Sequence, residues 1–191
     1  MRRIINSTYI TLDGVVEGPH LWPSFGGPRD ERFEQIQTDL ALSCDAMVMG
    51  RRTYDVFAPV WPTRSGDPLS DHLNAMPKYV VSTTLKDPEW NNTQVIDSDV
   101  VGEITRMKQA PGKDIVQYGY GVVSRLLLEH GLLDELRLWV HPLILGHGTL
   151  ADLLFGATPA VAFRLTDTTV LSDGIVLLSY QTDKTLDRAA A

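Results

Sequence analysis

A glycine-rich turn between a short apolar strand and a helix constrains the fold of this chain more than any other feature. The strand starts at Asp114, Gly119-Tyr120-Gly121 ends it, and a helix follows directly. A second strand, predicted over residues 136–145, closes a β–turn–α–β unit. Units of this kind build parallel sheets that carry helices on their faces.

The same turn has two interpretations. Glycine backbone can approach a bulky anion closely, and the first turn of the next helix points free N–H groups at such an anion. The dinucleotide fingerprint G-x-G-x-x-G is incomplete, because Ser124 stands where the third glycine would be. The alternative is a strand-to-helix turn that uses glycine only for its backbone angles.

Composition limits the class of protein. With 191 residues, of which 43% are hydrophobic and 21% charged, we expect one domain over 1–183 and a disordered tail over 184–191. A net charge of −7 argues against a nucleic-acid partner but allows a local basic pocket. The single cysteine, Cys44, permits no intrachain disulfide. Together with the absence of a long apolar run, this predicts a cytoplasmic protein without a membrane partner.

The order of predicted elements defines a fold class. Strand and helix alternate along most of the chain, and Asp173-Gly174 is a hairpin turn signal between strands predicted at 160–170 and 174–182. We therefore predict a mixed, mostly parallel sheet in a three-layer α/β/α arrangement, with a C-terminal antiparallel hairpin. The other elements expected are strands at 4–12, 45–49, 78–82 and 93–96, a helix at 30–43 capped by Asp30, and helices directly after Gly50 and at 98–109.

Two further turns follow predicted strands and carry groups that suit an anion. Gly50-Arg51-Arg52-Thr53 places two cations at a helix start, where acidic residues are usual. Ser82-Thr83-Thr84 places three hydroxyls after another strand. A solvated arginine pair and an ordinary turn are the alternatives. Because parallel strands end along one rim, one phosphorylated ligand could touch all three turns.

The loop over residues 15–30 holds candidate ligand contacts. It contains Gly18, Pro19 and Pro23 and is long for a compact domain, as lids and binding loops often are. Trp22 and Phe25 could contact a ligand or pin the loop to the body. The histidines lack metal-ligand spacing, so no metal site is expected. His141 lies in a predicted strand, where a core or interface role is expected.

Six short motifs, in order, resemble the dihydrofolate-reductase-like family, and most closely its branch that contains the C-terminal reductase domain of the riboflavin-biosynthesis deaminase–reductase. The resemblance covers residues 1–182. The motifs are Thr11-Leu12-Asp13-Gly14, Met49-Gly50-Arg51-Arg52-Thr53-Tyr54, Lys78-Tyr79-Val80-Val81-Ser82, Tyr118-Gly119-Tyr120-Gly121, Asp134-Glu135-Leu136-Arg137-Leu138 and Pro142-Leu143-Ile144-Leu145-Gly146.

The resemblance implies a sheet of eight or nine strands that binds NADPH across its rim. The residues it assigns to the cofactor share positions in the three turns. By position, the phosphate end is expected at Gly50, Arg51, Arg52 and Thr53, the adenosine half at Ser82 and Thr83, and the pyrophosphate at Gly119, Tyr120, Gly121 and Val122. An arginine near the ribose 2′-phosphate is the feature that favours NADP over NAD.

The resemblance also implies hydride transfer to a small heterocycle, a pterin, a pyrimidine or a related ring, as in the riboflavin-pathway 5-amino-6-(5-phosphoribosylamino)uracil reductase. Asp13 is the candidate catalytic acid, with a raised pKa if it is buried near the nicotinamide, or an anchor for a polar ring edge. The alternative is that Asp13 is only a turn residue of Asp13-Gly14. Glu17 and Trp22 are candidate substrate contacts. A lysine commonly follows Asp-Gly in the pyrimidine reductases, and here Val15 stands in its place. We expect a homodimer; the alternative function is a non-catalytic NADP(H)-binding protein of the same fold.

Overall fold

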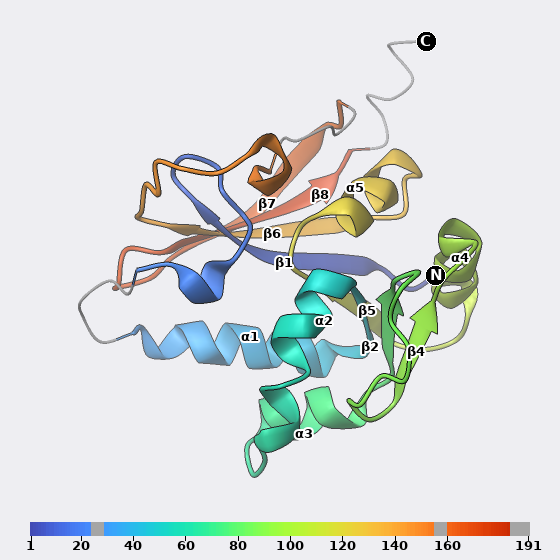
Figure 1. Cartoon of the computed structure of the whole chain (residues 1–191). Coiled ribbons are helices and arrows are strands. Elements are labelled where there is room, and N and C mark those ends of the chain that lie inside the picture. Colours follow the sequence, from blue (N-terminus) through green and yellow to red (C-terminus); the bar gives the residue numbers. More distant parts are fainter. Residues whose placement is uncertain (24–28, 155–159, 184–191) are drawn as a thin grey trace.

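A single sheet organises the computed structural model, which describes residues 1–23, 29–154 and 160–183 (Figure 1). Within these residues eight strands pair in the order β4-β3-β2-β5-β1-β6-β8-β7. The strands are β1 (Ile4–Thr11), β2 (Cys44–Gly50), β3 (Lys78–Val81), β4 (Thr93–Ile96), β5 (Asp114–Tyr118), β6 (Glu135–His141), β7 (Phe163–Val170) and β8 (Val176–Thr182).

Strand direction divides the sheet into two parts. The pairs from β4 to β6 are all parallel, whereas β8 runs antiparallel to β6 and β7 antiparallel to β8. The turn between the last two strands uses Gly174 at a φ of +86°, a conformation that glycine adopts without strain. The predicted mixed, mostly parallel sheet with a C-terminal antiparallel hairpin is confirmed.

Helices cover both faces of the sheet (Figure 1). Residues alternate along β1, so that Ile4 joins one core cluster and Ile5 the other. The first cluster includes side chains of α4 (Val100–Gln109) and α5 (Val122–Glu129). The second includes side chains of α1 (Glu31–Ser43), α2 (Arg51–Phe57) and α3 (Pro68–Ala75). This is the expected three-layer α/β/α arrangement.

Two local signals predicted element boundaries with different success. Asp30 was expected to cap a helix, and its Oδ1 accepts the N–H of Arg32 at 2.9 Å at the start of α1. The strand predicted over 136–145 ends at His141, because Pro142 has no N–H to donate to a neighbouring strand. The predicted tail 184–191 and Phe25 lie outside the described residues.

Parallel pairing brings the ends of β1 to β6 to one side of the sheet, which we call the carboxyl rim. The opposite side, where these strands begin, is the amino rim. Connections that leave the carboxyl rim lead into α2 after Gly50 and into α5 after Tyr118. The three glycine- or hydroxyl-rich turns of the sequence therefore share one rim.

A buried lysine stabilises the amino rim. Lys78, the first residue of β3, is fully buried, and its Nζ donates to the carbonyls of Asn74, Met76 and Asn91 at 2.8–2.9 Å. The ammonium also lies 4.6 Å from the centre of the Trp90 ring. These contacts join the end of α3 to the loop that precedes β4.

We predict that Lys78→Met destabilises the fold by about 2–4 kcal/mol, because three buried carbonyls lose their donor. The exposed Lys86 provides the control, and Lys86→Met should change the free energy of unfolding by no more than about 0.5 kcal/mol. Urea denaturation of both variants measures the difference. Equal stability of the two variants would contradict a structural role for the Lys78 ammonium.

Candidate active site at the carboxyl rim

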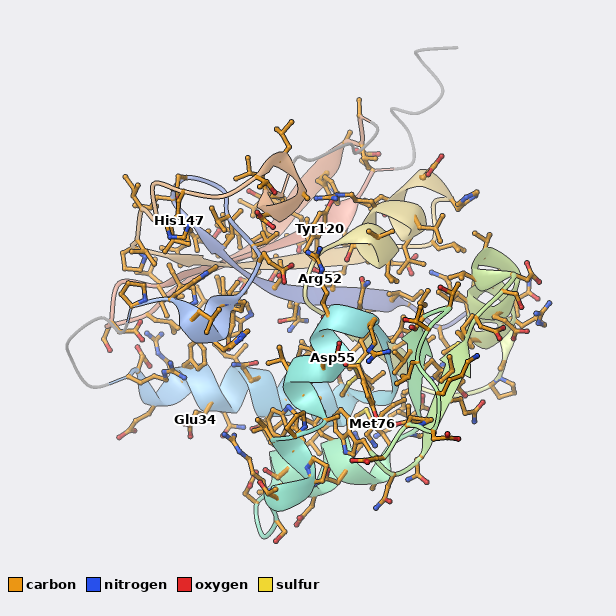
Figure 2. All side chains as sticks on the ribbon, in the orientation of Figure 1. Glu34, Arg52, Asp55, Met76, Tyr120 and His147 are labelled. Carbon is orange, nitrogen blue, oxygen red and sulfur yellow. The ribbon has the colours of Figure 1, made fainter. Side chains whose placement is uncertain are left out.

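The predicted turns lie side by side along the carboxyl rim. Ser82 follows β3, Gly50 ends β2, Gly119 follows β5, and Asp13 lies beyond the end of β1; these four strands are neighbours in that order. Three interstrand steps of about 4.8 Å span about 14 Å, which suits one extended ligand. Figure 2 labels Arg52 and Tyr120, which belong to two of these turns.

Gly119 is required by the fold itself. Its φ of +75° lies in the left-handed region, and a Cβ at this position would lie 2.7 Å from Thr53 Oγ1. The Thr53 hydroxyl donates to the carbonyl of Tyr118 at 3.4 Å, so α2 packs directly against the end of β5. The glycine therefore allows two neighbouring turns of the rim to approach each other closely.

Gly121 differs from Gly119 because the fold does not require a glycine there. Its φ of −166° is extended backbone, and no heavy atom of the described residues lies within 4 Å of the place that a Cβ would occupy. The next residue, Val122, begins α5, and the first N–H groups of a helix have no intrahelical acceptor. Open space beside free N–H groups is what close approach of a phosphate needs.

The Tyr120 ring does not occupy that space. The side chain is only 6% exposed and belongs to the core cluster that also contains Val123 and Leu127. Below the turn, Asn6 Nδ2 donates to the carbonyl of Gly119 at 2.7 Å. The Tyr120 ring and the Asn6 amide hold the turn against the core. Only the backbone of Tyr120 is therefore available for the expected pyrophosphate contact.

The two arginines of the second turn already have carboxylate partners. Arg51 Nε lies 2.7 Å from Asp55 Oδ1 within α2, and Arg52 Nη1 lies 3.4 Å from Glu17 Oε2. Both arginine side chains are more than one-third exposed, so these pairs contribute little to stability. A phosphate would have to compete with Asp55 and Glu17 for the guanidinium groups.

The hydroxyl-rich turn after β3 is partly committed to its own backbone. Ser82 is buried, and its Oγ accepts the N–H groups of Thr84 and Leu85 at 3.2 and 3.0 Å. Thr83 is exposed. The adenosine contact expected of these residues stays a prediction, and the exposed Thr83 is better placed for it than Ser82.

Asp13 differs from its expected chemistry. Its carboxylate accepts the Thr11 hydroxyl at 2.5 Å and the N–H groups of Leu145 and Gly146 at 3.3 and 2.8 Å. The bonds from Thr11 and Gly146 are the main cause that lowers the pKa of Asp13 to about 2. The expectation of a raised pKa is therefore wrong, because these donors stabilise the charged form. The structure supports an anchor that holds the segment after β6 against the end of β1.

Trp22, a candidate substrate contact, packs beside His141, a histidine that the sequence analysis did not assign to the site. Trp22 Nε1 donates to the carbonyl of Glu17 at 3.1 Å, and the Trp22 ring lies 5.5 Å from the ring of His141. His141 ends β6 at the carboxyl rim and is only 7% exposed. The sequence signal for a site residue was a polar side chain at the carboxyl end of a predicted strand, where ligands bind in open α/β sheets. The prediction of a core or interface role for His141 did not use it.

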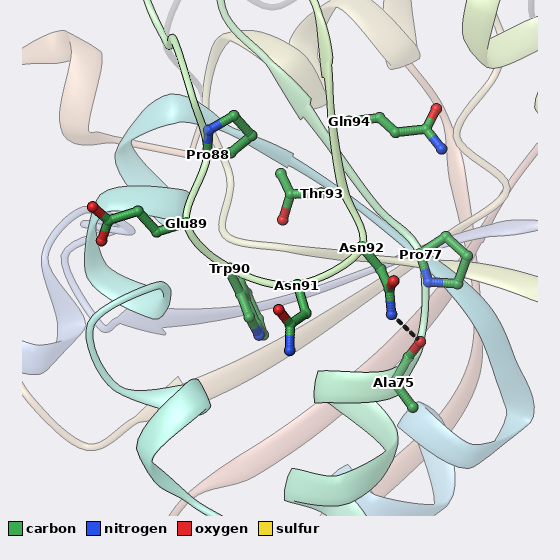
Figure 3. Close-up of a pocket in the computed structure, with 9 residues that line it drawn as sticks. All are labelled: Ala75, Pro77, Pro88, Glu89, Trp90, Asn91, Asn92, Thr93 and Gln94. Atoms are coloured by element: carbon green, nitrogen blue, oxygen red, sulfur yellow. Dashed lines mark hydrogen bonds between the residues drawn. The ribbon is translucent and has the colours of Figure 1, made fainter.

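A hollow elsewhere in the structure is not part of this rim. It has a volume of about 470 Å³ and is lined by Ala75, Pro77 and residues 88–94, at the amino rim beside β3 and β4 (Figure 3). In the described part of the chain, no three His, Cys, Asp or Glu side chains gather closely enough to hold a metal ion. No helix within the described ranges has the length and hydropathy that crossing a membrane requires.

Comparison with known proteins gives a consistent family and fold. The family model of the RibD C-terminal domain matches residues 2–177. The uncharacterized protein YyaP of Bacillus subtilis is 28% identical over 94% of both chains. A Shewanella sp. PV-4 protein named for riboflavin biosynthesis superposes with a TM-score of 0.69 at 22% identity, over 96% of this chain and all of its own. For RibD of Acinetobacter baumannii the TM-score is 0.65 at 16% identity, over 96% of this chain but 59% of that longer one.

We predict that Asp13→Asn lowers the melting temperature at neutral pH, because an amide replaces an acceptor of three hydrogen bonds. The pKa of Asp13 in the folded protein, about 2, lies below its ordinary value of 3.8. The stabilisation by the carboxylate is therefore complete above pH 3.8 and is lost as the pH falls toward 2.

Melting curves between pH 2 and pH 8 test this expectation. The difference between the wild type and Asp13→Asn should be constant from pH 8 to pH 5 and should shrink below pH 4. Asp39→Asn, at an exposed position of α1, is the control and should leave the pH profile unchanged. A difference that persists undiminished at pH 2 would rule out the ionised anchor.

Proposed function

The chain belongs to the family of the RibD C-terminal domain, and from this membership we propose that it is an NADPH-dependent reductase that transfers hydride to a small heterocyclic substrate. Its fold is the dihydrofolate-reductase-like α/β arrangement. The Thermotoga maritima structure of the same fold is described as a deaminase and 5-amino-6-(5-phosphoribosylamino)uracil reductase. The present chain covers 57% of that protein at 15% identity.

The observation that carries the proposal is the open position at Gly121. The backbone angle and packing of this residue would both accept a side chain, yet the sequence keeps a glycine beside the start of α5. A ligand phosphate that approaches the backbone gives a reason for it. Gly119, one position removed, is explained by Thr53 and needs no ligand.

The order of the strands supports an orientation for the cofactor. We place the adenosine half near Thr83, the 2′-phosphate near Arg51 and Arg52, and the pyrophosphate at Gly121 and Val122. The nicotinamide would then lie toward Asp13, beyond the end of β1. This order follows the sequence of neighbouring strands β3, β2, β5 and β1.

The reaction needs a hydride and a proton. NADPH supplies the hydride when it is bound, and the protein supplies orientation and access for the proton. Hydrogen bonds from Thr11 and Gly146 lower the pKa of Asp13 to about 2, which disfavours this carboxylate as the proton donor. We propose that Asp13 acts by holding residues 145 and 146 over the end of β1, and that the proton comes from solvent or from the substrate pocket.

The substrate class follows from what surrounds Asp13. Val15 is 5% exposed and pairs with Leu153 in an isolated bridge, so no cation stands where the pyrimidine reductases commonly have a lysine. We therefore propose a pterin, a pyrimidine or a related ring, and we do not require a phosphorylated sugar on it. The ionised Asp13 also favours the alternative of an NADP(H)-binding protein without turnover, which binds the cofactor but lacks an acid at this position.

The proposal includes the localisation and the oligomeric state of the protein. The one cysteine, Cys44, is buried and unpaired, which suits a cytoplasmic enzyme. Leu165, in the sheet-edge strand β7, is 50% exposed, which suits a homodimer in which a second copy covers that part of the sheet.

The first prediction of the proposed function is selective stabilisation by NADPH. A 100-fold excess over the dissociation constant should raise the melting temperature by about 5–10 °C. NADH should bind at least about tenfold more weakly, since it has no 2′-phosphate for the arginines. Thermal shift and fluorescence titration measure both ligands. No stabilisation by either ligand would remove the reductase and the binding-protein alternative together.

The arginines make that selectivity testable by substitution. Arg51→Gln and Arg52→Gln should each weaken NADPH binding about tenfold and leave NADH binding within about twofold. Arg106→Gln, at an exposed position on α4, is the matched control. If the arginine variants weakened both cofactors equally, these side chains would not contact the 2′-phosphate.

The second prediction separates the two glycines of the turn. Gly121→Ala should fold with a melting temperature within about 2 °C of the wild type, yet bind NADPH at least about tenfold more weakly, because a methyl group occupies the phosphate space. Gly119→Ala should lose about 1–3 kcal/mol of stability, because of its positive φ and the nearby Thr53. Wild-type NADPH affinity in Gly121→Ala would refute a pyrophosphate site at this turn.

A further inference from the structure

His141 has an unexplained polar atom. The residue ends β6 and lies opposite Thr11, the last residue of β1. Its side chain is only 7% exposed. Among the described residues its Nε2 has no hydrogen-bond partner, and it has almost no contact with solvent. A buried nitrogen without a partner is less stable than one that is hydrogen-bonded. The fold would be served better by an apolar side chain.

His72 shows how the same residue type behaves when it is structural. It lies on α3, and its Nε2 lies 2.9 Å from the carbonyl of Cys44, so its ring nitrogen is satisfied within the fold. His141 has aromatic neighbours instead. Its ring centre lies 4.9 Å from that of Tyr9 and 5.5 Å from that of Trp22, the latter nearly perpendicular at 81°.

These neighbours connect His141 with the proposed site. Trp22 is hydrogen-bonded to the backbone of Glu17, and the Glu17 carboxylate pairs with Arg52 on α2. On the adjacent strand, Asp13 holds the segment that follows His141. His141 therefore lies at the carboxyl rim one strand beyond β1, on the far side from the turns assigned to the cofactor phosphates.

His141 is uncharged at neutral pH. Burial is the main cause that lowers its pKa to about 4, and the nearby Arg29 lowers the pKa further, while Asp173 acts weakly in the opposite direction. A neutral imidazole carries one N–H donor and one acceptor nitrogen. Aromatic walls and a neutral imidazole suit an uncharged ring and disfavour an ionised one.

We propose that His141 recognises the substrate, and that its Nε2 hydrogen-bonds to the polar edge of an uncharged, planar heterocyclic lactam that packs beside Trp22. A lactam edge presents a carbonyl next to an N–H, so it can meet either tautomer of the imidazole. This inference rests on the proposed function, because it names the substrate class of the same site. It adds a residue that neither the resemblance nor the motifs assign.

The test uses the full chain and lumazine, a neutral pteridine dione, as the probe. Three variants are compared with the wild type. His141→Phe keeps a flat ring without nitrogen, His141→Gln places an amide near the position of Nε2, and His72→Gln is the histidine control. Lumazine and NADPH affinities are measured separately by fluorescence, and the ¹⁵N signal of His141 Nε2 is followed by NMR during the lumazine titration.

We expect His141→Phe to weaken lumazine binding at least about tenfold, the loss of one buried hydrogen bond, and to leave NADPH affinity within about twofold. His141→Gln should retain most of the affinity, and His72→Gln should bind as the wild type does. The melting temperature of His141→Phe should not fall, because it removes an unpartnered polar atom. If it does fall, His141→Leu replaces it as the apolar variant in the same comparison.

Two results would overturn the inference. One is wild-type lumazine affinity in the apolar variant. The other is a ¹⁵N signal of His141 Nε2 that does not move when lumazine is added, which is also the result if lumazine does not bind. The NADPH titration distinguishes failure of this inference from failure of the proposed function. Failure of all proteins to bind NADPH, with a His141 signal that still responds to lumazine, would remove the reductase proposal and retain the recognition residue.

Discussion

Parallel pairing of β3, β2, β5 and β1 is the constraint on which the rest of the structure depends. Four strands that run the same way must end on the same side, so four connections that are far apart in the chain meet at one rim. The hydrogen-bond register fixes their spacing, and the helices that follow β2 and β5 begin at that rim. A single antiparallel strand among these four would send one turn to the opposite side and divide the candidate site.

The rim also shows how a fold separates structural requirements from functional ones. Gly119 satisfies packing, because Thr53 occupies the space that a side chain would need. Neither the backbone φ nor the packing at Gly121 requires a glycine. His141 is similar in kind: its unpartnered nitrogen costs stability, whereas His72 has a partner. Features that the fold does not need, gathered at the strand ends of one rim, are the usual mark of a binding surface.

How much of this could be read from the sequence depends on the range of the interactions. Local chemistry predicted the Asp30 cap, the Asp173-Gly174 hairpin and the glycine turns, because each acts through residues close in the chain. The pKa of Asp13 depends on both ranges. Its largest cause, the bond from Thr11, is local, whereas the donors Leu145 and Gly146 lie more than 130 positions away and could not be predicted in this way. The same holds for His141, whose neighbours Tyr9 and Trp22 come from the other end of the chain.

The charges along the rim support a ligand whose two ends differ. Arg51 and Arg52 place positive charge beside α2, where a phosphate would lie. Toward β6, the negative charge of Asp13 is held by three hydrogen-bond donors, and His141 is neutral. Val15, which is buried and pairs with Leu153, adds no cation. A site built in this way can attract an anionic cofactor at one end and still favour an uncharged ring at the other, since each end selects by its own chemistry.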